Sequence, residues 1–168
     1  NWGENAYGLL LKEIDNSMIY FNNFTKNTVG IYSEGSNKLT VQNNRFKNNG
    51  WAMKVLGNCY DDVFSYNSFR NNIFDLATNS SKNTNKFENN YWDKYLGYDL
   101  EKDGIGDVAY RPMNLFSLLI ETSPDAIILL NSFMVNIIDF AEKISPAFTP
   151  ETLIDKRPLM KDFINAES

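Results

Sequence analysis

The chain has 168 residues, enough for one domain with a single core, and its 43% apolar and 14% aromatic content excludes an intrinsically disordered protein. It contains no His, which excludes His-ligated zinc or copper sites and imidazole-based catalytic groups within this sequence, and its single cysteine, Cys59, excludes an internal disulfide. The formal charge of -5 and the scattered Lys and Arg residues argue against a nucleic-acid partner.

A repeat of 22 to 23 residues organises residues 1–92. Each copy has an apolar residue, two variable residues, Asn, one variable residue and an aromatic residue, and period-2 apolar pairs follow. This period, without a Leu-x-x-Leu-x-Leu signature, predicts a mainly β fold, a right-handed parallel β-helix of about four to five coils over residues 1–98. The aromatic residues in register are Trp2, Phe24, Phe46, Phe69 and Trp92.

Asparagine occurs 24 times, and 20 of these residues lie before residue 91. Stacked coils place one Asn above the next, so that the side-chain amides can form a hydrogen-bonded ladder. Asn also tolerates the left-handed backbone conformations that the corners of a coil require. We therefore interpret the repeated Asn and aromatic positions, and Met53, as scaffold. Function on the coils must then use the positions expected to face outward: Lys54, Tyr60, Asp61, Asp62, Asp75 and Glu88.

An acidic, glycine-containing loop over residues 99–112 follows the coils. Its carboxylates alternate as in the first half of a calcium-binding loop, with Gly104 at the sharp turn, although Tyr110 replaces the usual bidentate Glu. Two interpretations stay open: a calcium site, or an acidic turn in which Gly104 and Gly106 serve only backbone geometry. The calcium ligands would be Asp99, Glu101, Asp103, the carbonyl of Ile105, and Asp107.

Residues 113–168 are expected to form a helical C-terminal cap or docking segment. Asn becomes rare there, and the stretch 126–141 is apolar over most of a helical surface. This stretch is shorter than the roughly 20 apolar residues of a bilayer span, so we expect no transmembrane segment. Its wide apolar face must be buried against the last coil, a partner protein or a membrane surface. The residues predicted to dock a partner are Leu129, Leu130, Phe133, Met134 and Ile137.

The run Asn-Asn-Tyr-Trp-Asp-Lys-Tyr at 89–95, the turn Asp-Gly-Ile-Gly-Asp at 103–107 and Tyr-Arg-Pro at 110–112 resemble the closing segment of the NosD family. The resemblance continues into the tail at 114–117 and 132–135 and covers nearly the whole chain. It implies a C-terminal portion of a periplasmic β-helix protein without enzymatic activity. Such a protein works with an ABC-type ATPase and its membrane subunit to supply copper, or support cluster assembly, for nitrous oxide reductase. Residues 1–5 show no signal-peptide features, so the periplasmic location rests on the resemblance.

Copper(I) bound by this chain would need thioether or thiolate ligands, because His is absent. Met113 and Met160 lie outside the expected apolar faces and are the candidate copper ligands. The other soft donors are Met18, Met53, Cys59 and Met134.

A polysaccharide lyase or hydrolase, or a carbohydrate-binding module, is the alternative function, since many such proteins are β-helices. Hydrolysis of a glycosidic bond needs two carboxylates at a fixed separation in one groove. Asp61, Asp62 and Asp75 are the plausible acids near one another across coils, and no Arg accompanies them at matching positions. A purely structural or adhesive module is a third possibility.

Overall fold

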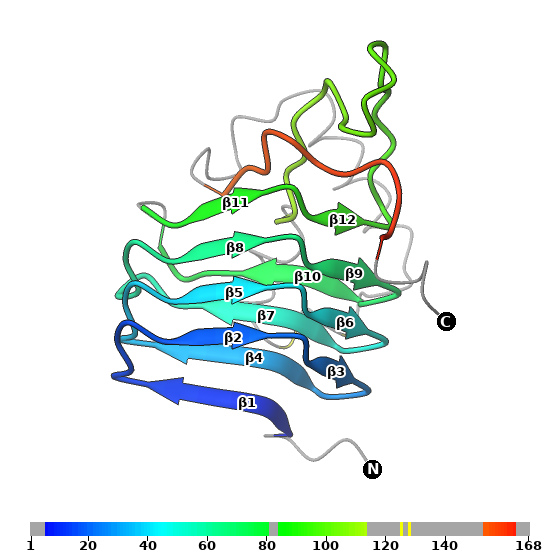
Figure 1. Cartoon of the computed structure of the whole chain (residues 1–168). Coiled ribbons are helices and arrows are strands. Elements are labelled where there is room, and N and C mark those ends of the chain that lie inside the picture. The colour runs from blue at the N-terminus through cyan, green and yellow to red at the C-terminus, as the bar shows by residue number, and fades with distance from the viewer. Residues whose placement is uncertain (1–5, 81–83, 114–124, 126–127, 129–152, 164–168) are drawn as a thin grey trace.

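A computed structural model of the chain describes residues 6–80, 84–113, 125, 128 and 153–163. The coils stack as a parallel solenoid in which each turn contributes one strand to each of three four-stranded sheets (Figure 1). The first sheet contains β1 (Tyr7–Lys12), β4 (Val29–Glu34), β7 (Trp51–Val55) and β10 (Phe74–Ala77). The second contains β2 (Met18–Tyr20), β5 (Thr40–Gln42), β8 (Val63–Ser65) and β11 (Lys86–Glu88). The third contains β3 (Asn23–Thr25), β6 (Arg45–Lys47), β9 (Ser68–Arg70) and β12 (Tyr91–Trp92).

The strand register matches the sequence repeat. Phe24 pairs with Phe46, and Phe46 pairs with Phe69, so one period of the repeat is one coil. Neighbouring parallel strands lie about 4.8 Å apart, which is close to the stacking distance of aromatic rings. The ring centroids of successive members of this column, which ends at Trp92, are 5.0, 4.9 and 4.0 Å apart. The predicted parallel solenoid and its register are therefore confirmed, while Trp2 lies outside the described residues.

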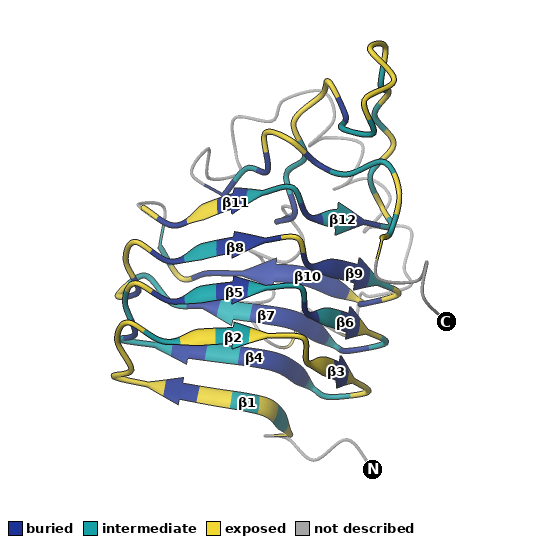
Figure 2. Cartoon of the chain, viewed as in Figure 1, coloured by how far each residue is buried: buried dark blue, intermediate teal, exposed yellow. Residues whose placement is uncertain are grey.

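The core fills the inside of the coils with further columns of apolar side chains. Met53 is fully buried between Ile31 and Leu76 of the neighbouring coils, as the scaffold interpretation predicted. Cys59 is also fully buried, and its sulfur lies 3.5 Å from the hydroxyl oxygen of Ser33. Figure 2 shows this burial deepening from the first coil toward the middle of the stack.

Two asparagine ladders run along the solenoid. In each step, the main-chain N–H and the side-chain amide of one Asn donate to the Oδ1 atom of the Asn in the next coil. Asn44, for example, donates to Asn67 from N at 3.0 Å and from Nδ2 at 3.1 Å. The ladder members are Asn22, Asn44, Asn67 and Asn90 in the first ladder and Asn27, Asn49 and Asn72 in the second. The predicted ladder is therefore confirmed.

The left-handed corners occupy the position directly before each ladder Asn. In the first ladder, the residue at this corner is Asn43 in one coil and Asn89 in another, but it is Phe21 or Tyr66 in the remaining two, with φ between 52° and 58° in all four. The expectation that Asn serves these corners is thus only partly right. Each ladder Asn binds the neighbouring coils through several hydrogen bonds, and this framework holds the preceding corner even where the side chain does not favour it.

Residues 153–163 lie across the last coil, as the red segment of Figure 1 shows. Parallel bridges join this segment to the last coil, and antiparallel bridges join its other edge to residues 105–110. The bridged pairs are Phe87 with Asp155, Tyr91 with Leu159, Ile105 with Leu159 and Tyr110 with Asp155. The C-terminal segment therefore closes the solenoid with an extended chain.

The predicted helical cap is not confirmed. Residues 153–163 contain bends and bridges and no helix. The helical stretch expected over 126–141, and with it the docking residues, lies outside the described residues. Within the described ranges, no helix is long and apolar enough to span a membrane.

Candidate functional site

The predicted acidic loop lies at the C-terminal end of the solenoid, where it rises beyond the last coil (Figure 1). Its carboxylates bind main-chain amides of the loop itself. Asp99 accepts from the N–H groups of Asp103 at 3.2 Å and Gly104 at 2.9 Å, and Asp107 accepts from Leu100 at 2.7 Å. These bonds are of the kind that Asp side chains make to stabilise turns.

The geometry favours the acidic-turn interpretation of this loop over the calcium site. Asp103 accepts from the N–H of Ile105 at 2.8 Å, so three of the predicted calcium ligands are engaged in turn hydrogen bonds, and Glu101 is exposed. Among the described residues, no group of three or more His, Cys, Asp or Glu side chains is placed to hold a metal ion. Calcium binding by this loop stays a prediction.

Tyr95 fixes the base of the loop. Its hydroxyl donates to the carbonyl oxygen of Val108 at 2.6 Å, and its ring lies between Gly97 and Gly106. A Cβ atom on either glycine would clash with the hydroxyl oxygen and the ring carbons of Tyr95, at separations that real side chains do not allow. Gly104 has a different role, because its φ of +86° is a conformation that L-residues rarely adopt. The glycines thus serve backbone geometry and close packing.

The loop is also joined to the C-terminal segment. The N–H of Gly106 donates to Pro158 at 2.7 Å, and the N–H of Met160 donates to Gly104 at 2.9 Å. Tyr110, at the end of the loop, packs edge-on against Tyr95 and also contacts Trp92 of the last coil. The loop, the last coil and the C-terminal segment therefore form one connected structure.

The two candidate copper ligands differ in burial. Met113 is 2% exposed and belongs to the apolar core, which corrects the expectation that it lies outside the apolar faces. Met160 is half-buried beside Gly104. Of the other described soft donors, Met53 and Cys59 are buried on separate elements and Met18 is exposed in the first coil. Copper binding by Met113 and Met160 stays a prediction, and Met134 lies outside the described residues.

Asp62, which was expected to face outward, is fully buried in a third ladder. Its N–H donates to Asn85 at 2.9 Å, and its Oδ1 accepts from the N–H of Leu39 at 2.8 Å. Among the described residues, its Oδ2 has no hydrogen-bond partner. Burial, with a smaller contribution from the nearby carboxylates of Asp61 and Asp15, raises the pKa of Asp62 to about 6.

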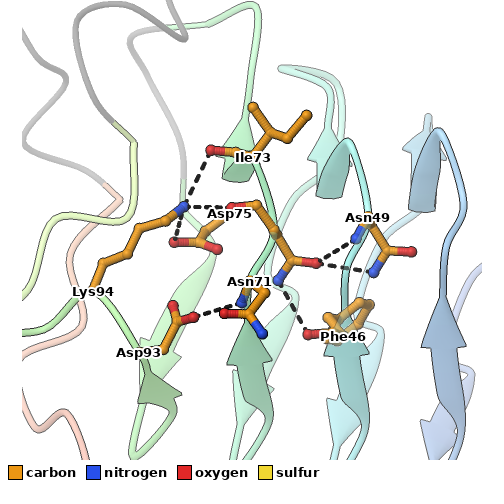
Figure 3. Close-up of polar contacts among 8 residues, drawn as sticks. Phe46, Asn49, Asn71, Ile73, Asp75, Asp93 and Lys94 are labelled. Atoms are coloured by element: carbon orange, nitrogen blue, oxygen red, sulfur yellow. Dashed lines mark hydrogen bonds and ion pairs between the residues drawn. The ribbon is translucent and has the colours of Figure 1, made fainter. Parts of the chain in front are cut away.

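Asp75 was also expected to face outward, and it is 2% exposed. Its Oδ2 lies 3.2 Å from the ammonium of Lys94, which also donates to the carbonyl oxygens of Asn72 at 2.8 Å and Ile73 at 3.2 Å (Figure 3). Burial raises the pKa of Asp75 to about 6, although Lys94 acts in the opposite direction.

The three candidate catalytic acids therefore have separate environments. Asp62 belongs to a ladder, Asp75 pairs with Lys94, and only Asp61 is exposed. Asp61 lines a surface groove of about 340 Å³ together with Asp15, Asn16, Asn37, Lys38 and Tyr60. Asp15 accepts from the N–H and the amide of Asn37, both at 3.1 Å, so the wall of this groove is itself a short ladder.

Lys94, Asp155 and Tyr95 shape this end of the molecule but are not among the predicted site residues. The sequence carries one usable signal for them, since Lys94 lies 22 residues after Asn72 and thus at the level of a further coil. Asp155 is not separated from the ladder asparagines by the repeat period of 22 to 23 residues, so the sequence pattern does not point to it. Asp62 could have been placed in a ladder, because Asn85 follows it by one full period of 23 residues.

Comparisons with known proteins give a family match over the residues that carry the repeat. A family described as "Periplasmic copper-binding protein (NosD)" matches residues 1–97. The chain is 28% identical over 125 residues to the "Probable ABC transporter binding protein NosD" of Stutzerimonas stutzeri, covering 73% of this chain and 29% of that protein. A protein of the same description from Pseudomonas aeruginosa is 28% identical over 134 residues, covering 78% and 31%. The chain thus spans less than a third of the length of these relatives.

Proposed function

Because the chain belongs to the NosD family of periplasmic copper-binding proteins, we propose that it is part of a periplasmic accessory protein of an ABC-type transporter. In this role it binds the transporter's ATPase and membrane subunit complex and supports copper supply or metal-cluster assembly for nitrous oxide reductase. The observation that carries the proposal is the family match over residues 1–97, which contain all four coils. The names of both relatives, which describe ABC transporter binding proteins, support the transporter as partner.

A deletion strain tests the role in reductase maturation. Cells that lack the gene for this protein should make nitrous oxide reductase with a low copper content, while the reductase polypeptide is still produced. Complementation with the intact gene should restore the metal. A reductase with full copper content and full activity in the deletion strain would contradict the proposal.

The predicted docking residues give a second test of transporter binding. We propose that the apolar face bearing Leu129, Leu130, Phe133, Met134 and Ile137 contacts the membrane subunit. Removal of the whole tail is a poor test, because Asp155 and Leu159 close the last coil and their loss would open the core. The combined substitution Leu129→Gln and Phe133→Gln should instead reduce co-purification with the transporter. Unchanged co-purification would show that another surface docks.

Copper binding by this chain is proposed with Met113 and Met160 as the candidate ligands. The buried position of Met113 argues that Met113→Leu leaves copper(I) retention unchanged. Met160→Leu tests the half-buried candidate. Metal analysis of the purified chain after incubation with copper(I) measures both, and stoichiometric copper that is lost in either variant would place a site there.

Carbohydrate binding is the second candidate, and the groove beside Tyr60 is the observation that favours it. An exposed aromatic ring next to amides and carboxylates is a surface on which a sugar ring could stack and form hydrogen bonds. Catalysis is less well supported, because Asp62 and Asp75 are buried in separate environments. Retention of the chain on immobilised polysaccharides, with loss of retention in Tyr60→Ala, would favour this function; release of reducing ends would indicate hydrolysis.

A further inference from the structure

The loop over residues 96–108 carries a group of exposed apolar side chains. Leu96 is 93% exposed, Leu100 75%, Tyr98 56% and Val108 41%. Figure 2 shows this loop as an exposed excursion beyond the last coil. Single exposed apolar residues are common on protein surfaces, but several gathered on one projecting segment are typical of an interaction site.

Hydrogen bonds within the loop and to its neighbours stabilise the backbone of this loop in the absence of a partner. Hydrogen bonds join its two sides, since Leu100 donates to Asp107 and Asp107 donates to the carbonyl of Tyr98. Its base is fixed by Tyr95 and by the bonds to the C-terminal segment described above. A surface that is already ordered loses little conformational entropy on association, which strengthens binding.

The charge of the loop indicates what kind of surface it fits. Asp99, Glu101, Asp103 and Asp107 against the single Lys102 give residues 96–108 a formal charge of -3. Such a loop is repelled by an anionic lipid surface and attracted by clustered Lys and Arg side chains. Complementary charge around an apolar contact accelerates association and selects the partner.

We propose that the 96–108 loop docks on the membrane subunit of the transporter, where its apolar side chains enter an apolar pocket rimmed by Lys and Arg. This inference rests on the proposed function, because it names a surface through which the chain binds that partner. Leu96 and Leu100 are the anchors, since they are the most exposed apolar residues of the loop. The carboxylates orient the approach and also maintain the turn.

Binding of the full chain to the detergent-solubilised transporter tests the proposal. The double substitution Leu96→Asn and Leu100→Asn should weaken binding at least about tenfold, because anchor residues carry most of the affinity of an interface. Leu10→Asn with Met18→Asn is the matched control, since Leu10 and Met18 are also exposed apolar residues but lie in the first coil. Circular dichroism and thermal unfolding should be the same for both double variants, which separates binding from folding.

A separate substitution tests the contribution of the acidic side chains of the loop to binding. Glu101→Lys should weaken binding several-fold and reduce its dependence on salt, because it replaces one attraction to the basic rim with a repulsion. Equal binding by the wild type and the Leu96/Leu100 double variant would overturn the loop proposal and leave the proposed function intact. A wild-type chain that does not bind the transporter would overturn both. Association with phosphatidylglycerol vesicles that the double variant loses would identify a lipid surface and also overturn it.

Discussion

The carboxylate of Asp155 occupies the position of the next asparagine in the first ladder. Its Oδ2 accepts hydrogen bonds from N of Asn90 at 3.0 Å and from Nδ2 of Asn90 at 3.1 Å, in the manner in which Asn90 itself accepts from Asn67. The same oxygen accepts from the indole N–H of Trp92 at 3.0 Å. A residue 65 positions away in sequence thus completes a column that the repeat builds.

Replacing Asp155 should destabilise the whole solenoid. Asp155→Ala leaves the main-chain N–H of Asn90 and the indole N–H of Trp92 without an acceptor and should lower the free energy of unfolding by about 3 kcal/mol. Asp155→Asn should cost about 1 kcal/mol, because its oxygen keeps these bonds while its amide faces the N–H of Arg157, which the carboxylate accepts at 3.0 Å. Urea unfolding followed by Trp fluorescence measures both. Lys156→Ala, at an exposed neighbour, is the control, and an Asp155→Ala variant as stable as that control would contradict this role.

Lys94 completes the end of the second ladder, and it does so as a hydrogen-bond donor and not, like Asp155, as an acceptor. In the coil below, the carbonyl of Asn49 accepts from the backbone N–H of Ile73 at 3.0 Å, whereas the carbonyl of Asn72 accepts from the Lys94 ammonium. The ammonium therefore takes the place of a backbone donor from a further coil, and the adjacent Asp75 compensates its charge.

Lys94→Met should lower the free energy of unfolding by about 3 kcal/mol, since it leaves the buried Asp75 carboxylate without its cation. Adding Asp75→Asn should recover part of this loss, because a neutral amide needs no partner charge. Urea unfolding of the two single variants and the double variant gives the coupling energy between the residues. Strictly additive losses would show that the pair does not act as a unit. Lys86→Met, at an exposed lysine, is the matched control.

Asp62 should make the protein less stable as the pH rises. The pKa of its carboxyl is about 6 in the folded chain and about 4 in an unfolded chain, so between these values the folded state binds more protons. Stability contributed by the protonated form is therefore present below pH 4 and is lost as the pH rises to about 6, by roughly 3 kcal/mol. Asp75, with a similar pKa, acts in the same direction.

Asp62→Asn should remove the Asp62 contribution, which is about half of the combined pH dependence of Asp62 and Asp75, and should stabilise the chain at pH 7. An amide at this position can donate to a carbonyl of the coil below, as Asn85 donates to Cys59 at 3.2 Å. Unfolding free energies at pH 4, 5, 6 and 7 measure the effect, with Glu101→Gln as the exposed control. A wild type and an Asp62→Asn variant with the same pH profile would show that Asp62 does not titrate in this window.

The coils were predictable because their constraints are periodic. Phe24, Phe46 and Phe69 contact one another across one period, and a sequence that repeats this contact displays it directly. It was harder to predict which Asn residues occupy the left-handed corners and which form the ladders. In the pair Asn43-Asn44 the first residue takes the left-handed corner and the second enters the ladder, and only the spacing of the second is strict.

The closing structure was not predictable in the same way. Asp155 replaces a ladder Asn, but nothing near it in sequence repeats, so neither its burial nor its partners follow from a pattern. The acidic loop has a clear sequence pattern, but this pattern is compatible with two different structures. The spacing of Asp99, Asp103 and Asp107 suits both a cation and a turn, and the choice depends on where main-chain N–H groups point, which the sequence does not specify.

The two central glycines of the acidic loop should differ in their tolerance of a methyl group. Gly106→Ala places a Cβ 2.6 Å from the ring of Tyr95 and should cost about 2 to 3 kcal/mol of stability, because the ring is fixed by its bond to Val108. Gly104→Ala meets no atom within 4 Å and should cost only about 1 kcal/mol, from its φ of +86°. Urea unfolding compares the two variants, and near-ultraviolet circular dichroism reports the Tyr environment. A larger loss for Gly104→Ala would mean that backbone conformation, and not packing against Tyr95, determines this loop.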